Sequence, residues 1–371
     1  MKKITFLTLH LGYGGVENAV TTLSNSLTED FQIEIVCAYK RYESPILKLN
    51  KKIKIKYIQE KPDIKINNKN ILEKTKTKIE KIKETRKENS LIKKYVKECD
   101  SDIIISTNYR YNKIICKYAK ENIVKIGWEH NYFENASYIK NVVTSAANLD
   151  YLILVSNHLK ELYENELKET KCKCIHIPNA LQELPSTVSQ LNTQNIITIG
   201  KLTKQKGYFE LIEIFKNVSL KFPDWKLHII GEGPEREKIE NRIKKYKLEN
   251  YVIMHGEKTR KFINKMLEQS SVYVMSSSQE GFGISILEAF SFGIPAVAFD
   301  SALGAKELIS NNWDGYIIND LDKEKMAKKI IDLIKNENRR TIMGDNARKK
   351  SMKYTIETIK EEWINILKEI W

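Results

Sequence analysis

The sequence of 371 residues contains no run of about eighteen apolar residues, the length a membrane-spanning helix needs. Its five cysteines are odd in number and scattered, and Cys172 and Cys174 stand too close together for a zinc site. We therefore expect a cytoplasmic protein with reduced thiols. The stretch MKKITFLTLHLGYGG has the two lysines of a signal peptide, but polar residues interrupt its apolar part, so we expect a first buried strand there.

Familiar nucleotide and metal signatures are incomplete. The GYGG turn lacks the Gly-Lys-Ser/Thr of a Walker loop, and Gly231-Glu232-Gly233 has Arg236 where a dinucleotide fingerprint has its third glycine. Pro234 is expected to start the next helix. Of two Asp-x-Asp triplets, residues 100–102 enter a strand and residues 320–322 are expected to cap a helix. Neither NAD binding nor a metal site is predicted.

Short β-branched runs recur along the chain with room for a helix between them, which indicates βαβ units and parallel sheets. The length suits two domains, and an apolar fraction of 42% is enough for two cores. A polar segment near residues 181–194 contains Pro185 and is expected to be a linker. The expected fold is α/β, with two Rossmann-like parallel-sheet domains at residues 1–184 and 195–353 facing across a cleft that holds the ligand. The expected strands are residues 4–9, 33–38, 53–58, 102–106, 124–128, 151–155, 174–177, 196–200, 226–230, 251–254, 271–275, 296–299 and 316–318.

The net charge of +14 is concentrated in residues 51–98, which hold 17 Lys or Arg against 7 Asp or Glu, a balance of +10. Most of this segment has few apolar residues and no glycine, so a solvated helix is expected. Such a helix can lie on an anionic membrane surface, where each lysine adds ~1 kcal/mol. A lysine-rich surface that reflects only composition is the alternative. Nucleic acid is not an expected partner, because this segment carries no recognisable nucleic-acid-binding motif.

Several loops at expected strand ends carry residues suited to a phosphorylated ligand. Gly12, Gly14 and Gly15 let the backbone approach a ligand, ahead of a helix expected to open at Val16. His130, in WEHN, suits a sugar hydroxyl or a phosphate. In a further loop, Lys201, Lys204 and Lys206 suit a diphosphate near a helix start. Each of the three loops also has a structural explanation: a tight turn for the glycines, a hydrogen-bonded structural residue for the histidine, and a solvated loop for the lysines.

The stretch SSSQEGFGISILEAF places two glutamates eight residues apart around a Gly-Phe-Gly turn. Gly281 and Gly283 let the backbone approach a phosphate or sugar, and a helix start from Ile284 again favours an anion. Glu288 would then reach a ribose diol, and Glu280 the hydroxyls of a sugar beyond the phosphates. Alternatively, Glu280 is a cap acceptor and Glu288 an exposed helix residue.

These motifs together resemble the retaining glycosyltransferases of family four, which have the GT-B fold and an E-x7-E signature. The resemblance covers essentially the whole chain, and the motifs stand in the family's order. It implies that the last helix, residues 354–371, returns to the first domain. The motifs are GYGGVENAV, WEHN, LVSNHLK, IHIPNA, IGKLTKQKG, IIGEGPE, IMHGE, EGFGISILEAFSFGIPAVAFD and ELISNNWDGYII.

The resemblance also implies site roles. His130 and Glu280 would act at the transferred sugar, and Glu288 would bind the ribose. The family has arginine where this chain has Lys201, and lysine loses the bidentate fork. The other implied donor contacts are Gly14 and Gly15 near the phosphates, Lys201 and Lys206 on the diphosphate, Gly256, Glu257 and Lys258 at the nucleobase, and Gly281, Phe282, Gly283 and Ile284 around the sugar.

By the same resemblance, transfer retains configuration by front-face attack, with the leaving phosphate taking the acceptor's proton, and requires no metal or other cofactor. Lys201, Lys206 and a helix dipole would oppose the charge on the leaving diphosphate. We expect a peripheral enzyme on the inner face of the plasma membrane. It would move a sugar from a nucleotide sugar, with UDP as the commonest donor nucleotide, to a lipid-linked acceptor. The product would be a bacterial surface polysaccharide such as capsule, lipopolysaccharide or teichoic acid. A protein or soluble acceptor and a nucleotide-sugar epimerase are the alternatives.

Overall fold

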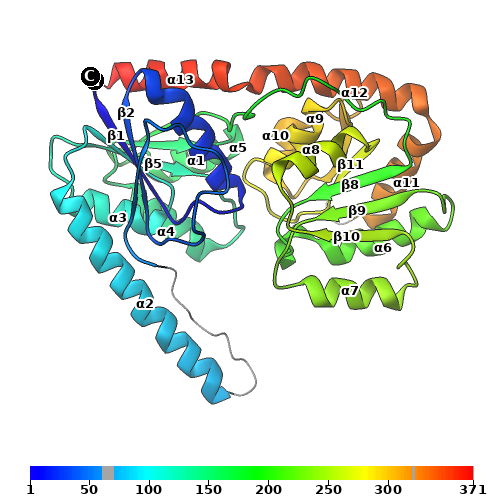
Figure 1. Ribbon diagram of the computed structural model, residues 1–371, viewed down its shortest axis with the longest axis horizontal. Coiled ribbons are helices and arrows are strands. Elements are labelled where there is room, and N and C mark those ends of the chain that lie inside the picture. The colour runs from blue at the N-terminus through cyan, green and yellow to red at the C-terminus, as the bar shows by residue number, and fades with distance from the viewer. Residues whose placement is uncertain (61–70, 320–321, 371) are drawn as a thin grey trace. The chain divides into compact units, whose positions relative to one another are not determined.

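The computed structural model describes residues 1–60, 71–319 and 322–370 (Figure 1). The chain divides into two compact units. The first holds residues 1–130, 135–180 and the chain from Ile359 onward, and the second holds residues 131–134 and 181–358. Residues 131–134 therefore group with the second unit, although the sequence places them inside the expected first domain.

All thirteen strands expected from the sequence are present, each within two residues of its expected bounds. They form one seven-stranded and one six-stranded sheet, and every pairing between these strands is parallel. The predicted α/β fold with two parallel-sheet domains is confirmed. None of the helices in the described ranges combines the length and hydropathy needed to cross a bilayer.

The sheet of the first unit has the order β3-β2-β1-β4-β5-β6-β7. Its strands are β1 Lys3–Thr8, β2 Gln32–Cys37, β3 Lys54–Tyr57, β4 Ile103–Ser106, β5 Val124–Glu129, β6 Tyr151–Leu154 and β7 Lys173–His176. Its helices are α1 Gly15–Ser26, η1 Leu27–Glu29, α2 Ile71–Glu98, α3 Tyr109–Tyr118, α4 Ala136–Ala146, α5 Asn157–Leu167 and most of α13 Ile356–Glu369. Because β-branched residues fill both faces of the inner strands, these read as continuous apolar runs in the sequence.

Helix α13 contacts the first unit through an aromatic pair. The ring of Trp363, which is fully buried, meets that of Trp128 edge-on at 5.0 Å between centroids. Lys360 adds an ion pair of 2.7 Å to Asp30. The end of the chain is thus packed beside the carboxyl end of β5.

The sheet of the second unit has the order β10-β9-β8-β11-β12-β13. Its strands are β8 Asn195–Ile199, β9 Lys226–Ile230, β10 Val252–Gly256, β11 Val272–Met275, β12 Ala296–Phe299 and β13 Gly315–Ile318. Its helices are η2 Lys204–Lys206, α6 Tyr208–Ser219, α7 Arg236–Lys245, α8 Arg260–Glu268, α9 Ile284–Ser291, α10 Leu303–Leu308, α11 Lys323–Lys335, α12 Glu337–Ser351 and η3 Met352–Tyr354. Helices α6 and α7 lie on one side of this sheet and α8, α9 and α10 on the other (Figure 1).

Two helix starts differ from expectation by one or two residues. Helix α1 begins at Gly15, one residue before Val16. Helix α7 begins at Arg236, so Pro234 precedes the helix instead of opening it. Asp322 caps α11 as expected, accepting from the N–H of Lys325 at 2.8 Å, whereas residues 320–321 lie outside the described residues.

Helix α2 is fixed to the first sheet along its carboxyl-terminal half (Figure 1). The hydroxyl of Tyr95 donates to Glu34 of β2 at 3.0 Å. About two helical turns earlier, Glu88 accepts from Tyr111 of α3 at 2.8 Å, and one turn before that Glu84 accepts from Gln59 at 3.0 Å. Together these contacts hold α2 from Glu84 onward.

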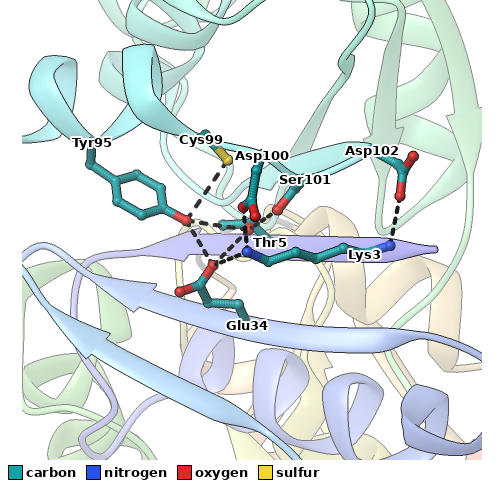
Figure 2. Close-up of polar contacts among 8 residues, drawn as sticks. All are labelled: Lys3, Thr5, Glu34, Tyr95, Cys99, Asp100, Ser101 and Asp102. Atoms are coloured by element: carbon teal, nitrogen blue, oxygen red, sulfur yellow. Dashed lines mark hydrogen bonds and ion pairs between the residues drawn. The ribbon is translucent and has the colours of Figure 1, made fainter. Parts of the chain in front are cut away.

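The contact at Tyr95 belongs to a polar network at the amino ends of β1, β2 and β4 (Figure 2). Thr5 and Ser101 share a hydrogen bond of 2.6 Å, and Lys3 pairs with Glu34 at 3.1 Å. Burial raises the pKa of Tyr95, so its hydroxyl stays neutral and can donate. The network lies at the opposite end of the strands from the loops expected to bind the ligand, and it anchors α2. Its members are Lys3, Thr5, Glu34, Tyr95, Cys99, Asp100, Ser101 and Asp102.

Candidate donor site

In the second unit, the strand order changes direction between β8 and β11, which are neighbours in the sheet. Ligands of such folds bind beside this point, at the carboxyl ends of the strands. The loops that follow β8 and β11 contact each other there: the N–H of Ser278 donates to the carbonyl of Gln205 at 2.9 Å, and Ser276 Oγ donates to the carbonyl of Lys206 at 3.0 Å. Residues about seventy positions apart thus form one surface.

Gly207 sits where these two loops cross. Its φ of 65° is in the left-handed region, and a Cβ there would lie 2.0 Å from the carbonyl oxygen of Ser276. Only glycine meets both conditions without strain. The close approach brings η2 and its lysine against the loop after β11.

Lys206 and Glu280 form an ion pair across the two loops. Their side chains are 26% and 18% exposed, so the pair is partly shielded from water. The alternative role of Glu280 as a helix cap is wrong, because the cap residue of α9 is Gly283 and no side chain caps it. The cation expected at the diphosphate and the carboxylate expected at the sugar are therefore in direct contact.

Glu288 lies in the second turn of α9 and its carboxylate is only 12% exposed, so its alternative role as an exposed helix residue is wrong. Its Oε1 pairs with a guanidinium nitrogen of Arg260, the first residue of α8, at 2.7 Å. Below it, the hydroxyl of Tyr273 hydrogen-bonds to Ser285 Oγ at 2.7 Å, which ties the first turn of α9 to β11. Burial raises the pKa of Tyr273, which therefore stays neutral.

The Gly-Phe-Gly turn is packed closely into the second unit. Gly283 has a φ of 88°, Phe282 is 2% exposed, and Ile284 is half-buried. Gly304 of α10 donates its N–H to the carbonyl of Glu280 at 3.0 Å, and a Cβ on Gly304 would lie 2.2 Å from the backbone of Phe282. The buried Gly281 completes this turn, whose shape is set by contacts on both sides.

The loop expected at the nucleobase begins one residue later than the sequence indicated. Gly256, with a φ of 76°, is the last residue of β10 and pairs with Ile230, so the loop proper starts at Glu257. Glu257 is exposed and Lys258 is half-buried, with its ammonium 5.2 Å from the ring centre of Phe262. Lys201, expected at the diphosphate, is exposed on the loop after β8.

Two histidines lie behind this loop. His228 Nδ1 and His255 Nε2 are 2.9 Å apart, and His228 Nε2 is 3.1 Å from Asn195 Oδ1. Burial, and then the charge His255 would carry, lower the pKa of His228 to about 4. Burial, followed by the charge of Lys258, lowers the pKa of His255. Both rings are therefore neutral at neutral pH and link β8, β9 and β10 by hydrogen bonds.

In the first unit, the glycine turn follows β1 as expected. Gly14 and Gly15 are exposed at the start of α1, and His10 Nδ1, in the turn before them, lies 3.0 Å from Glu17 Oε1. His130 follows β5 and is buried against the indole of Trp128, with ring centres 4.3 Å apart.

Burial lowers the pKa of His130 to about 3, against a smaller opposing effect of Asn179. The imidazole is therefore neutral at neutral pH, which suits a hydrogen bond to a hydroxyl and not a fixed positive charge.

The structure brings together Lys206, Glu280 and the Gly-Phe-Gly turn, and places Arg260 on Glu288. Sequence reasoning missed Arg260, which stands in a polar helix start where any exposed residue fits. Its signal was weak: it comes two residues after Lys258, the end of the expected nucleobase loop. In the described part of the chain, no group of three or more His, Cys, Asp or Glu side chains is arranged to hold a metal ion.

Comparison with known proteins finds glycosyltransferases that are similar to this chain. Residues 182–350 match the family described as Glycosyl transferases group 1. The chain is 28% identical over 375 residues to an uncharacterized glycosyltransferase of Haemophilus influenzae, covering 99% of this chain and 100% of the relative.

A second relative is 25% identical over 380 residues, and the match covers 100% of this chain and 99% of the relative. It is an alpha-1,4-N-acetyl-D-galactosaminyltransferase of Campylobacter jejuni, named for a glycan on diNAcBac-PP-undecaprenol.

Among solved structures, a mutant of S. aureus TarM in complex with Fondaparinux, alpha-GlcNAc-glycerol and UDP has a TM-score of 0.80 at 19% identity. The match covers 98% of this chain and 99% of that one, and at this identity it shows the shared fold of two Rossmann-like units. The chain is thus similar along its whole length to glycosyltransferases, and the unit that pairs Lys206 with Glu280 carries the match to Glycosyl transferases group 1.

Proposed function

We propose that this protein is a retaining glycosyltransferase that moves a sugar from a nucleotide sugar, with UDP as the nucleotide, to a lipid-linked acceptor of a bacterial surface polysaccharide. One observation carries the proposal: Lys206 and Glu280 meet at the switch point of the second sheet, beside the α9 start that holds Glu288. The names of the relatives support the rest, since one is a glycosyltransferase and another is named for an undecaprenol-linked glycan.

The residues of the second unit suit each part of such a donor. Lys206 and Lys201 supply positive charge for a diphosphate, and the N-terminus of α9 adds its free N–H groups. Glu288, an acceptor-only group when ionised, suits the two hydroxyls of a ribose. Glu280, once Lys206 turns to the phosphates, is released to accept from hydroxyls of the sugar.

Transfer needs the negative charge that builds up on the leaving diphosphate to be opposed. In this proposal the two lysines and the α9 dipole supply that opposition without a metal. The acceptor attacks from the same face that the diphosphate leaves, and a leaving phosphate oxygen takes the acceptor's proton. His130 remains a predicted sugar contact; as a neutral imidazole it can exchange a hydrogen bond but cannot add charge.

A thermal-shift screen of the purified protein tests the donor assignment. We expect UDP to raise the melting temperature, and GDP, ADP and CMP to do so less, with and without EDTA, because ligands that bind only the native state stabilise it. In a companion measurement, the protein is incubated without an acceptor, together with sugars linked to the nucleotide that stabilises it. Conversion of one sugar to its epimer would identify an epimerase instead, and no shift with any nucleotide would contradict the proposal.

The proposal includes attachment to an anionic membrane through α2. Upstream of Glu84 this helix exposes Lys78, Lys81 and Lys83 together with the apolar side chains of Ile79 and Ile82, which are 48% and 44% exposed. Lysines around exposed isoleucines suit a surface that is negatively charged and apolar beneath. Residues 61–70 of the predicted basic segment 51–98 lie outside the described residues.

Replacing Lys78, Lys81 and Lys83 with glutamine is expected to weaken binding to vesicles containing anionic lipid by about 3 kcal/mol, roughly a hundredfold, since each lysine near the surface adds ~1 kcal/mol. Vesicle cosedimentation measures this. The matched control replaces Lys244, Lys245 and Lys247, which are exposed on the second unit and carry the same charge. Equal losses in both variants, or no binding by the wild type, would contradict a specific role for α2.

A further inference from the structure

Arg260 forms an ion pair with the carboxylate that the proposed function assigns to the ribose. It opens α8, directly after the cap residue Thr259, and its guanidinium reaches across to Glu288 of α9 at 2.7 Å. The contact joins two helices that are separated in the chain by β11. It is partly buried, with 31% of the Arg260 side chain and 12% of the Glu288 side chain exposed.

The simplest explanation of this contact is an ion pair that stabilises the packing of two helices, but such a pair would add little to the stability of the fold. Ion pairs that remain partly exposed add little to stability, because screening and side-chain ordering offset the attraction. Arg339 and Asp332 make a comparable pair between α12 and α11 at 3.0 Å, away from the switch point. What distinguishes Arg260 is the identity of its partner.

The physical effect of Arg260 on Glu288 is to orient it. An arginine is always charged, and its rigid planar guanidinium fixes the direction of a partner carboxylate, whose oxygens accept from hydroxyls. Held through Oε1, the Glu288 side chain loses its freedom before the ligand arrives. Preorganised groups bind more tightly because their ordering no longer opposes association.

We propose that Arg260 is a positioning residue that sets the Glu288 carboxylate for the ribose hydroxyls of the donor. The inference rests on the proposed function, because it takes a ribose as the ligand of Glu288. Arg260 then acts through Glu288 and not on the phosphates. Its removal matters only for ligands that carry the hydroxyls.

Titration calorimetry with UDP and with 2′,3′-dideoxy-UDP tests this directly. We expect Arg260→Met to weaken UDP binding by about tenfold, consistent with the loss of one preorganised side chain, and to leave dideoxy-UDP binding unchanged. Arg260→Lys should recover part of the loss. In a Glu288→Ala background, Arg260→Met should cause no further loss, because the two residues act as one unit. Arg339→Met is the matched control, and UDP binding should equal that of the wild type.

The outcomes separate the two proposals. If the wild type binds none of UDP, GDP, ADP or CMP, the proposed function fails and this inference fails with it. If the wild type binds UDP but Arg260→Met binds it equally well, only the inference is overturned. Equal weakening of UDP and dideoxy-UDP also overturns it, since Arg260 would then contact the phosphates or support the fold. Melting curves of Arg260→Met and Arg260→Lys confirm that the variants compared are folded.

Discussion

Replacing Lys206 with alanine is expected to lower the rate constant of sugar transfer by about 10²–10³-fold, the loss typical when one group opposing transition-state charge is removed. Lys206 is partly shielded, with 26% of its side chain exposed, so its charge is screened less than that of a surface lysine. The measurement is the initial rate at saturating donor. Lys221→Ala, at an exposed position of the same unit, is the control and should transfer at the wild-type rate.

Removing Lys206 also leaves Glu280 without the cation that it holds in this structure. The double variant Lys206→Ala, Glu280→Gln separates the two effects, because it removes both charges of the pair. We expect it to melt near the wild-type temperature and still to transfer slowly. A rate within about threefold of wild type in Lys206→Ala would show that this lysine does not oppose the leaving charge; that threshold lies well below the loss expected for such a group.

Replacing Gly207 with alanine is expected to destabilise the second unit by about 2–5 kcal/mol. Roughly 1–2 kcal/mol comes from placing a Cβ in the left-handed region, and about 1–3 kcal/mol from the overlap with Ser276, whose carbonyl oxygen would lie 2.0 Å away. Urea unfolding followed by circular dichroism measures the change. Donor binding should weaken with it, because Gly207 sets how closely Lys206 approaches the loop after β11.

Gly293 provides the matched control for Gly207. It has a φ of 71°, yet the nearest atom to an added Cβ is 3.6 Å away, an ordinary contact. Gly293→Ala should therefore lose only the roughly 1–2 kcal/mol of the left-handed conformation. Equal destabilisation of the two variants would mean that the crossing of the two loops at Gly207 is not tight.

Much of the fold could be predicted because parallel strands buried on both faces leave a plain signal in the sequence. Runs such as IIIS at β4 and AVAF at β12 contain almost nothing but apolar residues, and turns separate them from helices. The order of strands leaves no such signal. That β8 lies beside β11 depends on how the crossovers wind, and this adjacency brings Lys206 to Glu280.

The candidate site was predictable only in part for the same reason. Glu280 and Glu288 stand out because glycines surround them, whereas Arg260 looks like any residue of a polar helix start. The burial of His130 depends on its neighbours in space, among them the ring of Trp128. The network around Thr5 draws on separate stretches of chain, so no local pattern announces it.

Helix α2 is attached to the rest of the first unit from its middle onward. The contacts described above, at Glu84, Glu88 and Tyr95, begin at the middle of the helix and continue toward its carboxyl end. Whole turns inserted before Glu84 would lengthen the helix by about 1.5 Å per residue and keep these contacts on the same helix face. We therefore expect the length of α2 ahead of Glu84 to vary with less effect on the first sheet than a change of the same size after Glu84.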